Sequence, residues 1–111
     1  MNGRAELVLF IAQRASAAVL APLVLAHLVT MIVVVQDGLS AAEILARTRG
    51  SWGWAAFYGL FVAAAAIHAP IGLRTVLGET FGWRGPAVDI ALVVFALLLL
   101  MLGIGAVRAL A

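Results

Sequence analysis

The sequence has no cysteine, no lysine and little charge of either sign. Without cysteine, the 111-residue chain can form neither a disulfide bond nor a thiolate-ligated iron–sulfur cluster, so any electron carrier that it binds needs other ligands. Only 11% of its residues are charged and 66% are hydrophobic, which is far from the composition of a soluble globular domain. Its seven basic residues, all arginine, form no cluster that would follow a nucleic-acid backbone. These absences argue against nucleic-acid binding and indicate an integral membrane protein.

Three hydrophobic stretches are long enough to cross a bilayer, which takes roughly 20 residues in a helix. We place them at about residues 15–35, 55–73 and 87–107. The first stretch is too long for a cleavable signal peptide and is followed by no small-residue cleavage pattern, so we expect it to remain in the mature protein. The sequence therefore predicts an all-α integral membrane protein, with one domain over residues 1–111 and three transmembrane helices.

The two connections carry residue types that mark a membrane surface. Ser40 and Glu43 match a capping box, which predicts a short amphipathic helix over about residues 41–47 on that surface. The second connection is rich in glycine, and Pro86 suits the start of the third helix. Aromatic residues mark the two interfaces: Trp52, Trp54 and Tyr58 on one side, Trp83 on the other.

Arginines are divided unevenly between the two sides of the membrane. The side of the amino terminus holds Arg4, Arg14, Arg74 and Arg84, and the other side holds Arg47, Arg49 and Arg108. Because basic residues favour the cytoplasmic side, this division places the amino terminus in the cytoplasm.

Three helices bury few side chains from lipid, so we also expect a membrane partner. Small residues for close helix contact are the Ala63–Ala66 run, Gly103 and Gly105.

Both histidines lie inside predicted spans, His27 in the first and His68 in the second. Polar side chains at this depth are costly and usually face a bundle interior, a cavity or a cofactor. Neutral imidazole is a common axial ligand of haem iron, which takes one nitrogen on each face. An intramembrane histidine can also be only a hydrogen-bonding contact between helices, so both interpretations are open at this point.

The residues after His68 strengthen the haem interpretation. Gly72 follows four positions later on the same helix face, where a missing side chain lets a flat macrocycle approach. Pro70 leaves the carbonyl of Ala66 without its usual donor and predicts a kink beside the histidine. Arg74 then emerges at the membrane surface, where it either pairs with a haem propionate or serves only as an anchor.

The two histidines are expected at different depths. If Arg14 and Arg74 mark one membrane surface, the helical rise places the two imidazoles about 10 Å apart in depth. A single upright haem does not suit both, so we expect two haems, each with a second ligand from a partner. Ser16 shares a helix face with His27, and its hydroxyl either meets a propionate or a quinone oxygen or caps the helix.

The segments around the two histidines resemble the membrane-anchor cytochrome b subunits of succinate dehydrogenase and fumarate reductase. QRASAAVLAPLVLAHLV is similar to the first-helix pattern of an arginine, a hydroxyl–small pair and a central histidine. IHAPIGLRTVLGE is similar to the second-helix pattern of histidine, glycine four later and arginine six later. The resemblance implies a helical anchor in the bacterial inner membrane. It would hold a flavoprotein subunit and an iron–sulfur subunit on the cytoplasmic face and pass electrons between the clusters and membrane quinone.

The resemblance also implies roles for single residues. His68 matches the haem b ligand of the second helix, and His27 matches the first-helix ligand of the two-haem members. Arg14 matches an arginine of the quinone site or of the haem propionates, and Arg74 matches the propionate-side arginine. The single-chain two-haem members have five helices and four histidines, whereas three spans and two histidines are found here. The chain therefore looks like one of a pair of anchor subunits.

Two positions depart from the family pattern. Phe10 stands where one-haem relatives place a quinone-site serine, and Glu79 stands where aspartate is common. We expect a haem b-binding anchor that does no chemistry on succinate or fumarate itself, in which Arg14, with Ser16, binds the quinone carbonyl. The alternative is a haem-free anchor or assembly subunit with structural histidines. A small multidrug-type transporter fits least, because none of the five acidic residues falls near a helix centre.

Overall fold

The computed structural model describes residues 3–110, and these residues form helices and no strand. Helix α1 spans Gly3–Asp37, α2 spans Ala41–Thr48, α3 spans Trp52–Val76 and α4 spans Pro86–Leu110; a π-helical turn, η1, spans Leu77–Phe81 and continues α3. Three segments are long and apolar enough to cross a bilayer: α1, α3 with η1, and α4. The predicted all-α fold with three membrane helices and a short surface helix is confirmed.

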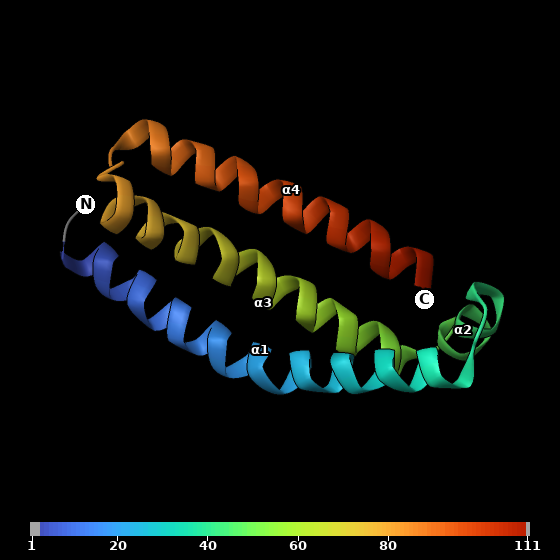
Figure 1. Cartoon of the computed structure of the whole chain (residues 1–111). Helices are drawn as coiled ribbons and strands as arrows, with labels where there is room; N and C mark the ends of the chain where they lie inside the picture. Colours follow the sequence, from blue (N-terminus) through green and yellow to red (C-terminus); the bar gives the residue numbers. More distant parts are fainter. Residues whose placement is uncertain (1–2, 111) are drawn as a thin grey trace.

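Helix α3 lies between α1 and α4 and packs against both (Figure 1). The start of α1 and the connection between α3 and α4 lie at one end of the bundle, and α2 and the end of α4 lie at the other. The core is thin, because Ala64, Pro70 and Leu92 are its buried apolar side chains among the described residues. Most large apolar side chains face outward, as expected for a surface that lipid or another membrane subunit covers.

Helix α1 begins much earlier than the sequence predicted. The predicted first span counted only the apolar stretch from about residue 15, whereas the residues before it are mainly good helix formers with no proline among them. The 35-residue helix runs along a bundle whose longest dimension is 49 Å, well beyond a hydrocarbon core of about 30 Å. Ser16 therefore lies in the helix interior, and its interpretation as a helix cap is wrong.

Helices α3 and α4 approach each other closely at Gly103. A Cβ atom added there would overlap Cγ1 of Val62 and would lie 2.8 Å from its Cγ2 and 3.1 Å from its Cβ. Only a glycine fits without a shift of the two helices. A Cβ added at Gly105 would meet nothing within 4 Å, so of the two glycines predicted to allow close contact, only Gly103 lies at such a contact.

The surface helix α2 is capped and tied to the bundle. Ser40 Oγ accepts a hydrogen bond from the Glu43 backbone N–H at 3.2 Å, and the Ser40 N–H donates to Glu43 Oε1 at 3.2 Å, which is the predicted capping box. Buried Thr48 Oγ1 donates to the carbonyl oxygen of Leu110 at 2.8 Å. This bond satisfies one of the carbonyls that the end of α4 would otherwise leave without a donor.

Helix α3 runs unbroken through Pro70, which is buried, and then widens into η1. The chain leaves η1 at Gly82, whose φ of 69° is the left-handed conformation that favours glycine. Arg84 Nη2 donates to the carbonyl oxygen of Gly78 at 3.1 Å and so satisfies an acceptor within η1. As predicted, α4 begins at Pro86.

Candidate functional site

His68 lies half-buried between α3 and α1. Its Nδ1 atom lies 3.4 Å from Oγ of Ser16, a buried residue of α1. Within residues 3–110, its Nε2 atom has no hydrogen bond, and the one enclosed side-chain nitrogen or oxygen without a partner is Oε1 of Gln13. Nε2 of His68 is therefore not enclosed by this chain.

His27 lies half-buried on α1 among aromatic side chains of α3. Its Nδ1 atom lies 3.5 Å from the hydroxyl oxygen of Tyr58. The imidazole stands edge-on to the rings of Tyr58 and Phe61, with ring centres 5.8 and 5.6 Å away, and Trp54 stacks on Tyr58. Tyr58, which the sequence assigned to the membrane surface, thus also contacts the histidine.

The two histidines form a reciprocal pair of contacts between α1 and α3. Each imidazole meets a hydroxyl of the other helix at Nδ1: Ser16 of α1 lies beside His68, and Tyr58 of α3 lies beside His27. Because His27 follows Ser16 by eleven residues on α1, about 16 Å of helix separates the levels of the two imidazoles. The structure keeps the histidines at different levels, as the helical rise predicts, and the separation is larger than the predicted 10 Å.

Gly72 shares the face of α3 that carries His68, and this face is turned toward α1. A Cβ atom added at Gly72 would lie 3.2 Å from Nε2 of Gln13. The missing side chain therefore makes room for a glutamine of the neighbouring helix, a neighbour that the sequence did not predict.

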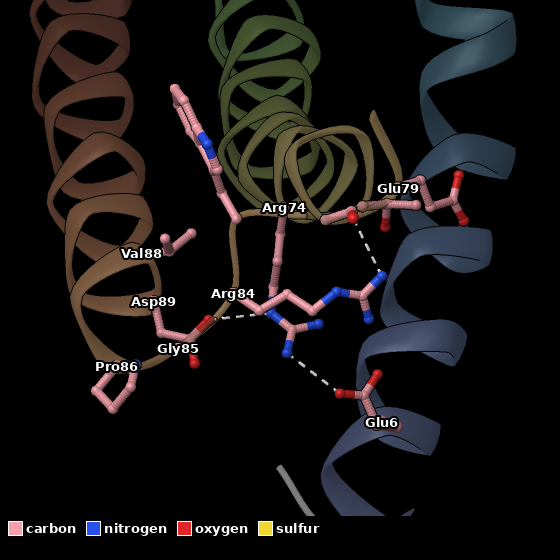
Figure 2. A pocket seen from close by; sticks show the side chains of 11 residues that line it. Glu6, Arg74, Glu79, Arg84, Gly85, Pro86, Val88 and Asp89 are labelled. Carbon is pink, nitrogen blue, oxygen red and sulfur yellow. Dashed lines mark hydrogen bonds and ion pairs between the residues drawn. The ribbon is translucent and has the colours of Figure 1, made fainter. Parts of the chain in front are cut away.

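Arg74 joins the ends of three helices (Figure 2). Its Nε donates to Oδ1 of Asp89 on α4 at 3.1 Å, and its Nη2 donates to Oε1 of Glu6 on α1 at 3.2 Å. These groups border a pocket of about 580 Å³ at this end of the bundle, which is also lined by Glu79, Trp83 and Arg84. Sequence reasoning identified neither Glu6 nor Asp89 as a partner of Arg74.

Arg14 lies on the exposed surface of α1, two positions before Ser16. The central carbon of its guanidinium group lies 5.7 Å from the centre of the Phe10 ring. Phe10, the departure from the family pattern, is thus a cation–π neighbour of the arginine assigned to quinone.

At each of the two levels, the chain offers one imidazole as a metal ligand: His68 at one level and His27 at the other. Within residues 3–110, no three histidine or acidic side chains gather in a way that could hold a metal ion. A metal centre at either level would therefore need ligands from outside this chain or from a cofactor.

Comparison with protein-family models matches residues 1–106 to the succinate dehydrogenase/fumarate reductase transmembrane subunit family. The matched region contains α1, α2, α3 and most of α4, with both histidine-containing segments. Comparisons with curated proteins and with solved structures give no match. The chain therefore belongs to the family of succinate dehydrogenase/fumarate reductase transmembrane subunits, and it is a membrane-anchor subunit of that kind of complex.

Proposed function

We propose that the chain holds haem b through His68 and His27 in a succinate:quinone oxidoreductase and so helps electrons pass between the iron–sulfur subunit and membrane quinone. The proposal rests on the surroundings of the two ring nitrogens in each imidazole. Each has Nδ1 at a hydroxyl of the neighbouring helix and Nε2 not enclosed by the chain. Haem iron takes nitrogen ligands, so His68 and His27 would each hold a separate haem through Nε2.

A second membrane-anchor subunit would supply the opposite ligands. The separation of about 16 Å between the two levels favours one haem at each level rather than one haem between both histidines. The outward apolar surface of the three helices offers the area that a second anchor subunit needs. Bound haem supplies one-electron transfer inside the membrane, while the chain orients the ligands and excludes water.

The structure narrows the roles proposed for the other predicted site residues. Arg74 already pairs with the carboxylates of Asp89 and Glu6, so a haem propionate would have to compete with these two groups for the guanidinium. The hydroxyl hydrogen of Ser16 is donated to the Gln13 carbonyl, which leaves the exposed guanidinium of Arg14 as the donor for a quinone carbonyl.

We place the protein in the bacterial inner membrane with the amino-terminal end in the cytoplasm. The end of the bundle that holds the start of α1 and the connection between α3 and α4 carries Arg4, Arg74 and Arg84. The iron–sulfur and flavoprotein subunits would dock on this end, close to the lower-numbered part of α1 and to the level of His68.

Absorbance spectra of the purified complex test the proposal. We expect His68→Ala and His27→Ala each to remove part of the reduced b-type band, because each loses one axial nitrogen. Thr30→Ala is the matched control, since its hydroxyl donates within α1 to Ala26 one turn from His27. A wild-type complex without haem, or full haem in both histidine variants, would refute haem binding.

The alternative is a haem-free anchor in which both histidines only join helices. It is favoured by the fact that both Nδ1 contacts bridge α1 and α3. In that case the histidine variants would weaken the association of α1 with α3 while the wild type shows no b-type band. The same spectra, with a measurement of complex stability, separate the two functions.

A further inference from the structure

The contacts of Ser16 bear on which ring nitrogen of His68 carries the proton. Ser16 stands inside α1, where a serine hydroxyl often donates to a carbonyl of the preceding turn. Its Oγ lies 3.0 Å from the Gln13 carbonyl oxygen, which can only accept, so the single hydroxyl hydrogen points to Gln13. Toward Nδ1 of His68, 3.4 Å away, Oγ is then left as an acceptor. Nδ1 must carry a hydrogen to use this contact.

A neutral imidazole carries one ring hydrogen, so a hydrogen on Nδ1 leaves a lone pair on Nε2. That is the form in which Nε2 binds a metal. An acceptor at the opposite nitrogen also fixes the ring orientation and makes the ligand more basic. Ser16 is 5% exposed, so water has little access to the hydroxyl and competes weakly for the contact.

We propose that Ser16 is a positioning residue that selects the Nδ1–H tautomer of His68 and presents Nε2 as a ligand. This inference rests on the proposed haem ligation by His68. It replaces the predicted contact of Ser16 with a propionate or a quinone, because both the hydrogen and an acceptor position of the hydroxyl have partners inside the protein.

The contact at His27 differs in one respect. The Tyr58 hydroxyl has no hydrogen-bond partner other than His27 among the described residues, so it can either donate to Nδ1 or accept from it. Of the two hydroxyls, only that of Ser16 donates its hydrogen to another acceptor, the Gln13 carbonyl oxygen. The selection of a tautomer by a hydroxyl is therefore specific to His68.

The test uses the purified complex with Ser16→Thr and Ser16→Val, a pair of similar shape in which only threonine keeps a hydroxyl. We expect Ser16→Val to bind the His68-dependent haem about tenfold more weakly, as is typical when the hydrogen-bond partner of a ligating histidine is lost. The ferric form should lose most, because it gains most from a basic ligand. A tenfold loss on the ferric side raises the haem midpoint potential by about 59 mV. Ser16→Thr should keep the wild-type potential and affinity.

Three results bear on the inference separately from the function. If His68→Ala removes a haem but Ser16→Val and Ser16→Thr share the wild-type potential, haem ligation stands and the role of Ser16 is refuted. If both Ser16 variants shift the potential equally, the hydroxyl is not the cause and the inference is refuted as well. If His68→Ala keeps all haem, the proposed function fails and the inference fails with it.

Discussion

Substitution of Gly103 by alanine tests the close contact between α3 and α4. The added Cβ would overlap Cγ1 of Val62 and lie 2.8 Å from Cγ2, whereas carbon atoms at optimal separation lie about 3.5–4.0 Å apart. Rotation of Val62 cannot relieve this, because its Cβ is itself 3.1 Å away and β-branched side chains have one preferred rotamer in helices. The two helices must separate, and overpacking of this kind costs about 1–3 kcal/mol.

Gly105→Ala is the matched control, because its Cβ would meet nothing within 4 Å while the change in helix propensity is the same. The assay is the fraction of the chain that stays assembled when the detergent-purified complex is heated. We expect Gly103→Ala to be less stable than Gly105→Ala by about 1–3 kcal/mol, and Val62→Ala to restore much of that loss in the double variant. Equal stability of the two alanine variants would refute the reasoning.

Two further predictions concern the ends of the bundle. Arg74→Gln removes both ion pairs and should lower the stability of the complex by about 0.5–2 kcal/mol in the same assay, because each partly exposed pair contributes at most about 1 kcal/mol. The loss of stability should be smaller at high salt. Arg74→Lys should recover part of the lost stability. A loss that salt does not change would contradict the ionic origin. In α2, the hydrogen bond from the Ser40 N–H, helped by Arg47, lowers the pKa of Glu43. This stabilisation is complete above the ordinary carboxyl pKa and is lost as the pH falls through the lowered pKa, so protection of α2 amides from hydrogen exchange should fall in acid. Glu43→Gln should remove this pH dependence, and an equal response in both proteins would disprove it.

Local rules in the sequence were enough for the fold. Runs of apolar residues predicted three membrane helices, and the spacing of Ser40 and Glu43 predicted the capped surface helix. Pro86 predicted the start of α4. The start of α1 was predicted wrongly, because hydropathy locates the hydrocarbon core and not the helix that extends beyond it.

The contacts of the candidate site depend on how the helices are rotated about their axes, which periodicity in a nearly uniform apolar chain does not reveal. Ser16 and His27 share a face of α1, yet each meets a different residue of α3. The opposite charges of Arg74 and Asp89 on either side of a short connection could have suggested their pairing. Glu6, on α1, gave no such local signal. Haem and quinone binding stay predictions from the sequence pattern and the family.

The position of Arg74 has a consequence for how the protein is made. Glu6, in α1, is translated before Arg74, and Asp89, in α4, is translated after it. An inserted hairpin of α1 and α3 would give the guanidinium one of its two carboxylates, and the second arrives only with α4. The second ion pair of Arg74 can therefore form only after α4 has been synthesised and inserted.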